Sequence, residues 1–115
     1  MLAAFDFGIS NTDVAIFSKN SVQYFTTPSS GQDITTDLIK KILSKLDIPI
    51  SKVEAFGVTG GKSSDLDDSL MTKKIIKVNE IDAIGLGAKK LYKLRDEPTL
   101  VVSAGTGTAC VHVDN

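Results

Sequence analysis

The stretch that decides the fold is Asp6-Phe7-Gly8-Ile9-Ser10-Asn11-Thr12, a loop of small and hydroxylated residues between two β-rich runs. Apolar residues precede it over positions 1–5 and follow it over positions 14–17. This pattern predicts a hairpin whose turn presents backbone N–H groups to an anion. A loop of the same character, Ser103-Ala104-Gly105-Thr106-Gly107-Thr108, lies between β-rich runs near the end of the sequence. We interpret the two loops as a pair of phosphate-binding loops.

The composition limits the size and the class of the protein. Its 115 residues, 42% of them hydrophobic, are enough for one compact domain but not for two full ones. The net charge is −1, and no run of Lys and Arg is longer than two, so we expect neither a nucleic-acid partner nor a membrane-surface partner. No segment approaches the ~20 apolar residues that span a bilayer, and no basic leader is present. We therefore expect a soluble, cytoplasmic protein whose partners are small molecules or other proteins.

Cysteine and histidine are scarce. Cys110 is the single cysteine and His112 the single histidine, which excludes an intrachain disulfide and leaves too few ligands for a zinc or iron–sulfur site. We interpret both as strand residues of a reduced protein.

The first half of the sequence predicts a β-meander followed by a helix. Strands are expected over residues 3–7, 13–18 and 22–26, because these runs are rich in β-branched and aromatic residues. Apolar residues then recur at three- and four-residue spacing, which predicts an amphipathic helix that ends near Pro49. These apolar residues are Ile34, Leu38, Ile42, Leu43 and Leu46.

The ends and the polar face of this helix are also predicted. Ser30 and Asp33 offer a capping box at its start. Its lysines, which include Lys40, Lys41 and Lys45, are interpreted as a solvated face.

The second half predicts alternating strands and helices. A strand over residues 53–58 ends in the small-residue loop 59–64, and ligands of open α/β sheets bind beyond such strand ends. A short strand is expected over residues 73–78, then a helix over residues 80–92 with Asn79 as its N-cap. Gly85 and Gly87 each cost about 1 kcal/mol in a helix interior, so they predict close approach of another backbone or helix.

This element order, β-β-β-α-β-β-α followed by a hairpin, predicts an α/β protein with one mixed sheet and helices packed on it. The final hairpin repeats the pattern with which the sequence opens. We therefore expect a domain over residues 1–97 and, over residues 98–115, the first hairpin of a second domain.

Four segments together resemble the type II pantothenate kinases in order and spacing. They are residues 6–12, 58–61, 77–87 and 101–109. That family belongs to the superfamily of actin, sugar kinases and Hsp70 ATPases. The resemblance covers nearly the whole chain and implies a ribonuclease-H-like (actin-like ATPase) N-terminal domain. It also implies ATP-dependent phosphorylation of pantothenate, the first step of coenzyme A synthesis.

The resemblance implies roles for individual residues, with ATP and Mg²⁺ as cofactors. Asp6 would hold the Mg²⁺ through water, and Glu80 would be the general base that takes the proton of the substrate hydroxyl. The first phosphate loop would contribute Gly8, Ser10, Asn11 and Thr12. The second phosphate loop would contribute Gly105, Thr106, Gly107 and Thr108. The substrate cleft would be bordered by Thr59, Gly60 and Gly61.

The chain departs from the family pattern at two positions and in length. Asp13 replaces a lysine or arginine, and its charge would repel phosphate by about 1 kcal/mol at a wet site. Ile9 replaces a glycine or another small residue. The family binds adenosine with glycine-rich segments of a second domain, which lie beyond Asn115. We therefore expect little kinase activity from these 115 residues alone, and either a homodimer or pairing with a chain that supplies the second domain.

Three alternatives remain on the sequence. One is a non-catalytic binding or regulatory subunit of the same fold, for which Asp13 is the discriminating residue. A second is a kinase of another small hydroxylated substrate, such as a sugar, which rests on analogy of fold. The third, an activator ATPase that shares an iron–sulfur cluster, is disfavoured because the cluster needs several cysteines and Cys110 is alone.

Overall fold

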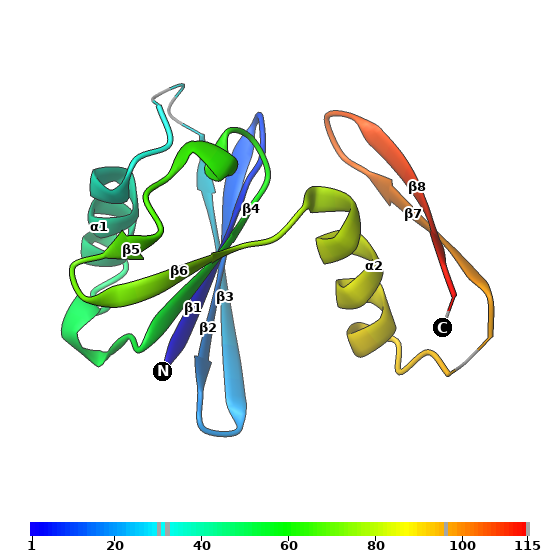
Figure 1. Ribbon diagram of the computed structural model, residues 1–115, viewed down its shortest axis with the longest axis horizontal. Helices are drawn as coiled ribbons and strands as arrows, with labels where there is room; N and C mark the ends of the chain where they lie inside the picture. The colour runs from blue at the N-terminus through cyan, green and yellow to red at the C-terminus, as the bar shows by residue number, and fades with distance from the viewer. Residues whose placement is uncertain (30, 32, 96, 115) are drawn as a thin grey trace. The chain divides into compact units, whose positions relative to one another are not determined.

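The computed structural model describes residues 1–29, 31, 33–95 and 97–114. It divides into two compact units, Met1–Lys77 and Val78–Asn115, and each is described here by itself. The first unit contains a six-stranded sheet (Figure 1). Its strands are β1 (Leu2–Phe7), β2 (Asn11–Ser18), β3 (Ser21–Pro28), β4 (Ala55–Thr59), β5 (Ser69–Leu70) and β6 (Lys73–Lys77).

The order of the strands across this mixed sheet is β3-β2-β1-β4-β6-β5. β1, β2 and β3 form the predicted antiparallel meander, and β1, β4 and β6 run parallel to one another. The carboxyl ends of β1 and β4 therefore meet at the same edge of the sheet. The two-residue strand β5 was not predicted, because so short a segment has no periodicity to detect.

Helix α1 (Thr36–Lys45) is the predicted amphipathic helix, but it begins later than expected. Thr35 is the N-cap, and its side-chain oxygen accepts a hydrogen bond of 3.2 Å from the backbone N–H of Leu38. The capping box predicted for Ser30 and Asp33 is therefore wrong for Asp33, which precedes the cap; Ser30 lies outside the described residues. Two short 3₁₀ helices, η1 (Ile50–Lys52) and η2 (Ser63–Asp65), complete this unit.

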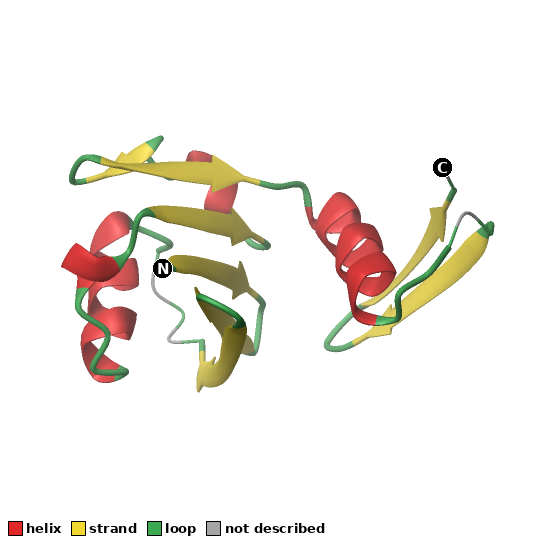
Figure 2. Ribbon diagram, turned by 90° about the horizontal axis from the view of Figure 1, so that it is seen from below, coloured by secondary structure: helices red, strands yellow, loops and turns green. Residues whose placement is uncertain are grey.

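The hydrophobic core of the first unit lies between α1 and one face of the sheet. Phe5 is 1% exposed, and its ring stacks on that of Phe7, with 5.8 Å between the ring centroids. Phe56 of β4 packs against Phe5 from the neighbouring strand, and Ile39 and Leu43 of α1 belong to the same cluster. Both Figure 1 and Figure 2 show α1 on one side of the strands. Since side chains alternate along a strand, Asp6 lies on the opposite, outward face.

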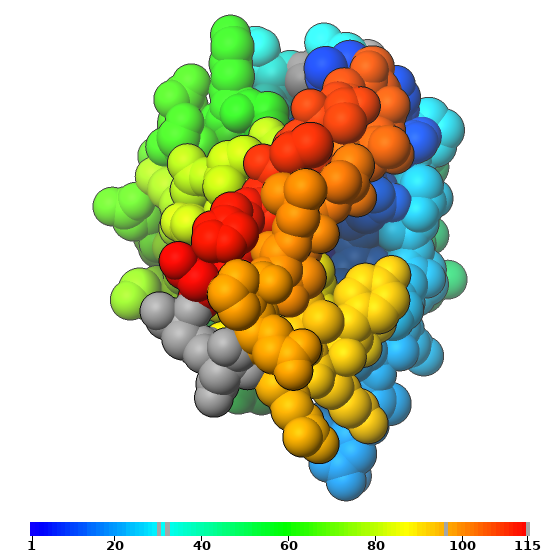
Figure 3. Space-filling model, turned by 90° about the vertical axis from the view of Figure 1, so that its right-hand side faces the viewer, coloured from blue at the N-terminus to red at the C-terminus, as the bar shows by residue number. Residues whose placement is uncertain are grey.

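The second unit consists of helix α2 (Glu80–Leu91) and a hairpin of β7 (Thr99–Ala104) and β8 (Thr108–Val113). Figure 3 shows the two hairpin strands side by side, in orange and red. Asn79 is the N-cap as predicted, and its Oδ1 accepts a hydrogen bond of 2.9 Å from the backbone N–H of Ile81. Cys110 and His112 lie in β8, which confirms their interpretation as strand residues. No helix in the described ranges is long and apolar enough to cross a membrane.

The two glycines of α2 differ in their surroundings. A Cβ atom on Gly85 would lie 3.3 Å from Val113 Cγ2 and 3.5 Å from Val111 Cγ1, so α2 packs closely on β8 at this position. The approaching atoms belong to strand side chains, not to a backbone or a helix as predicted. For Gly87 the prediction of a close approach is wrong, because a Cβ atom there would meet no atom of the described residues within 4 Å.

Candidate functional site

The loop between β1 and β2 is tightly built. A Cβ atom on Gly8 would lie 2.7 Å from the carbonyl oxygen of Asn11, so the turn requires glycine at this position. Ser29, which follows β3, anchors the loop twice. Its backbone N–H donates to the carbonyl oxygen of Ser10 at 2.8 Å, and its hydroxyl donates to the carbonyl oxygen of Gly8 at 2.8 Å. The loop is thus held in place by the residue that follows β3, while Ile9 is 83% exposed.

Asp6 at the end of β1 lies against the loop that follows β4. The parallel register places Asp6 beside Thr59, and Gly60 follows with φ of +75°. A Cβ atom on Gly60 would lie 2.5 Å from Asp6 Oδ1 and 2.8 Å from the carbonyl oxygen of Phe7. The absence of a side chain at Gly60 therefore makes room for the Asp6 carboxylate. Thr59 Oγ1 is buried and has no hydrogen-bond partner among the described residues.

A second carboxylate lies beside Asp6 on the outward face of the sheet. Asp13 of β2 is directly opposite Asp6 in the antiparallel register, and such partners have Cα atoms about 4.5–5.5 Å apart. Thr26 of β3 is opposite Asp13 and donates a hydrogen bond of 2.6 Å from its hydroxyl to Asp13 Oδ1. Two like charges at this spacing repel each other and any bare phosphate, whereas a divalent cation would be attracted.

Thr12, although predicted to bind the nucleotide, is turned to the inward face. It is 5% exposed, and its Oγ1 lies 3.4 Å from the hydroxyl oxygen of Ser29. It lines a pocket of about 390 Å³ between the β1–β2 loop, the end of β3 and α1. Gly61, with φ of +47°, closes one side of this pocket, since a Cβ atom there would lie 2.7 Å from Ile34 Cδ1. The first phosphate loop thus separates an outward, acidic side from an inward, pocketed side.

The structure brings the first phosphate loop together with the predicted substrate-cleft residues Thr59, Gly60 and Gly61, all in the first unit. The other predicted site residues belong to the second unit. Glu80 is exposed at the start of α2, where the helix dipole favours a carboxylate. The Gly105–Thr108 loop is the tight turn between β7 and β8, in which the backbone N–H of Gly105 donates to the carbonyl oxygen of Gly107 at 2.8 Å.

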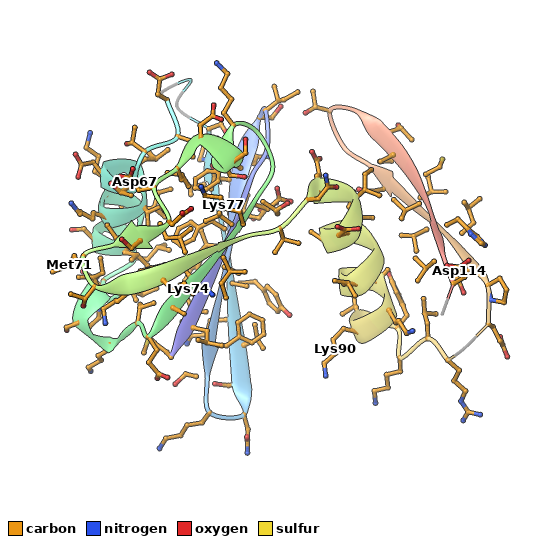
Figure 4. All side chains as sticks on the ribbon, viewed as in Figure 1. Asp67, Met71, Lys74, Lys77, Lys90 and Asp114 are labelled. Carbon is orange, nitrogen blue, oxygen red and sulfur yellow. The ribbon has the colours of Figure 1, made fainter. Side chains whose placement is uncertain are left out.

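Charged groups outside the site are arranged as surface ion pairs. Hydrogen bonding and the positive charge of the partner lower the pKa of three exposed carboxyl groups. The pairs are Asp37 with Lys40 at 2.8 Å, Glu54 with the N-terminal ammonium group at 2.6 Å, and Asp68 with Lys77, labelled in Figure 4, at 2.9 Å. In the part of the chain that the structure describes, no group of three or more His, Cys, Asp or Glu side chains is close enough to hold a metal ion by itself.

Two residues of the pocket were missed as candidates. Lys41 and Lys45 are exposed, in agreement with their interpretation as part of a solvated face, and both also line the pocket beside Leu38 and Ile42. The sequence did contain a signal, because residues four apart lie on the same face of a helix. The β1–β2 loop and the end of β3, which border the same pocket, are distant from α1 in the sequence. The spacing of residues within α1 therefore does not reveal the pocket.

The comparisons with known proteins identify the fold. No family model and no curated protein matches the chain. Among solved structures, the activator of the 2-hydroxyisocaproyl-CoA dehydratase from Clostridium difficile, with bound ADPNP, matches 88% of this chain with a TM-score of 0.60 and 15% identity. A protein of Sinorhizobium meliloti assigned as a 2-dehydro-3-deoxygalactonokinase matches 100% of this chain with a TM-score of 0.70 and 12% identity.

This chain has the actin-like ATPase fold. The strand order and both structural neighbours confirm the predicted ribonuclease-H-like fold class. At 12–15% identity the likeness concerns the fold alone, and neither neighbour is named as a pantothenate kinase. The chain spans 36% of the length of the activator and 50% of the length of the kinase.

Proposed function

We propose that this chain is the N-terminal, phosphate-binding part of an ATP-dependent phosphotransferase. The observation that supports this most directly is the contact between the Asp6 carboxylate and Gly60 at the carboxyl ends of β1 and β4. In this fold class one neighbour was solved with a bound ATP analogue, and the other is assigned as a kinase. A carboxylate beside a glycine turn suits a metal–nucleotide complex, because the carboxylate attracts the hard cation and the backbone N–H groups of the turn bind phosphate oxygens.

The residues present fit Mg²⁺ and ATP. Asp6 would hold Mg²⁺ through water, and the buried, unpartnered Thr59 hydroxyl is a polar group available beside it. The phosphates would lie on the backbone of the first loop, at Gly8, Ser10 and Asn11. When bound, Mg²⁺ neutralises charge on the phosphates. The first loop needs glycine at position 8, because any side chain there would overlap the backbone of the turn.

In this proposal Glu80 is the general base and pantothenate the acceptor. A carboxylate can take the proton of a primary hydroxyl. Positioning and charge neutralisation contribute most of the catalysis in phosphoryl transfer, so Glu80 chiefly orients the hydroxyl for in-line attack. Support for pantothenate comes from the sequence resemblance, and a sugar or another small hydroxylated compound is the competing acceptor.

Nucleotide binding is tested by titrating the isotope-labelled chain with Mg·ADPNP and following amide NMR signals. We expect the largest shifts at Gly8, Ser10 and Gly60. Asp6→Asn should weaken binding about tenfold, the size of one water-mediated charge interaction lost. Asp67→Asn removes the same charge from an exposed loop position and should leave the affinity unchanged. Equal affinities for the two variants, or no shifts with the unsubstituted chain, would contradict the proposal.

The acceptor is tested with the complete gene product by measuring ADP formation. We expect a rate that requires pantothenate and that Glu80→Gln reduces. The neighbouring Asp82→Asn, also in the first turn of α2, is the matched control and should keep most of the activity. Activity with a sugar but not with pantothenate would show that the acceptor is a sugar, and the phosphotransferase assignment would stand.

A second candidate function is supported by Asp13. Because it lies opposite Asp6, the outward face presents two carboxylates where a phosphate-binding cation would be expected. A non-catalytic binding or regulatory subunit of the same fold would have no need of that cation. The substitution Asp13→Lys separates this candidate from the phosphotransferase.

A further inference from the structure

The inward pocket beside the first phosphate loop combines an apolar wall with two cationic groups. Its volume of about 390 Å³ is within the range of small-molecule sites. Ile34, Leu38 and Ile42 form part of the apolar lining, and the hydroxyl-bearing residues Thr12 and Ser29 line it as well. Lys41 and Lys45 of α1 also line the pocket.

This pocket is distinct from the acidic side of the loop. Phe7 and Thr12 are register partners on β1 and β2, are both buried, and both line the pocket. Asp6 and Asp13 are the adjacent pair in the same register, so their side chains point to the opposite face of the sheet. A ligand in the pocket therefore does not occupy the position proposed for Mg²⁺.

The charged side chains that line the pocket, among the described residues, are those of Lys41 and Lys45. Neither Lys41 nor Lys45 forms an ion pair with any residue that the structure describes, whereas the adjacent Lys40 is paired with Asp37 at 2.8 Å. Among its described lining residues the pocket has no aspartate or glutamate. Lys41 and Lys45 are four residues apart and so lie on the same face of α1, one turn from each other. Two cations beside an apolar wall are complementary to an anion with an apolar body.

We propose that this pocket binds a small amphipathic anion, with its anionic head group at Lys41 and Lys45 and a short aliphatic body against Ile34, Leu38 and Ile42. The head group is a carboxylate or a phosphate monoester, since both accept hydrogen bonds from ammonium groups. The Thr12 and Ser29 hydroxyls are further donors on the same lining. This binding activity goes beyond phosphoryl transfer and does not depend on it.

The test is an amide NMR titration of the full 115-residue chain with octanoate and, in parallel, with octyl phosphate. Acetate supplies the charge without the body, and 1-octanol the body without the charge. We expect at least one of the two amphiphiles to bind about tenfold more tightly than acetate and 1-octanol, with shifts at Gly8, Gly31 and Gly61. The tighter of the two amphiphiles identifies the head group. Equal binding of 1-octanol, or shifts located elsewhere, would overturn the proposal.

The lysines are tested with the double variant Lys41→Gln/Lys45→Gln. The variant should lose about tenfold or more in affinity for the tighter amphiphile, because two charge-assisted contacts are removed. Lys40→Gln is the matched control on the same helix; it removes a cation outside the pocket and should bind as the original chain does. Unchanged thermal unfolding of both variants shows that the helix is intact. If both variants bind equally well, the lysines do not hold the ligand and the proposal fails.

Discussion

Replacing Gly60 with alanine is expected to lower the free energy of unfolding of the first unit by about 2–4 kcal/mol. Gly60 has φ of +75°, a conformation that costs an L-residue about 1 kcal/mol. The added Cβ would also lie 2.8 Å from the carbonyl oxygen of Phe7, a backbone atom of β1 that cannot move without disturbing the sheet. Strain and steric overlap therefore act together at this position.

The same substitution should impair the candidate site. The new Cβ would lie 2.5 Å from Asp6 Oδ1, so the carboxylate has to rotate away from the β4 loop. We expect Gly60→Ala to lose affinity for Mg·ADPNP by about as much as Asp6→Asn, roughly tenfold. Urea unfolding followed by far-UV circular dichroism measures the stability, and the NMR titration measures the binding.

Gly57→Ala is the control for both measurements. Gly57 lies in β4, three residues before Gly60, and a Cβ atom there would make an ordinary contact of 3.8 Å with Ala4 Cβ. It should leave the stability unchanged or raise it by up to about 1 kcal/mol, because glycine is unfavourable within a strand. Equal stability of the Gly57 and Gly60 variants would show that the tight packing of Gly60 on β1 is not maintained in solution.

Much of the fold could be predicted because its main signals are local. The alternation in β1 and β2 and the three- and four-residue spacing in α1 each arise from one face being buried. The start of α1 was misplaced because several residues before it are able to cap, and Thr35 is the one that lies where the helical backbone begins. The two-residue strand β5 is defined by its pairing with β6, and so short a segment has no sequence pattern of its own.

The candidate site was predictable in its parts but not in its arrangement. Asp6 and the glycines at 60 and 61 could be singled out by residue type and by their place after strands. Their contact depends on the parallel pairing of β1 with β4, two strands separated by the meander and α1, and no local signal specifies that pairing. The position of Asp13 opposite Asp6 likewise follows only once the register of the hairpin is known. Non-local pairing therefore determines what the outward face offers to a ligand.

Asp13→Lys is expected to raise the affinity of the chain for Mg·ADPNP about thirtyfold at low salt. The change replaces a negative charge with a positive one beside the position proposed for the phosphates, and each unit of charge at about 4 Å in water is worth about 1 kcal/mol. Asp13→Asn removes only the repulsion and should give about half of the gain in free energy. Thr26 loses its acceptor in Asp13→Lys, whereas the amide oxygen in Asp13→Asn can still accept its hydrogen bond. The Thr26 hydroxyl is exposed and can bond to water, so the fold should tolerate both changes.

Two comparisons make the Asp13→Lys result decisive. Asp67→Lys makes the same change of charge at an exposed position in the loop before β5 and controls for the net charge of the protein. The gain from Asp13→Lys should shrink as salt is raised from 10 mM to 150 mM, since the Debye length falls from about 30 Å to about 8 Å. If neither the original chain nor the Asp13→Lys variant binds the nucleotide, the phosphotransferase proposal fails and the non-catalytic subunit is favoured. If the original chain binds and Asp13→Lys weakens it, the carboxylate at position 13 acts with Asp6 in attracting the cation, and the departure from the family pattern is itself part of the site.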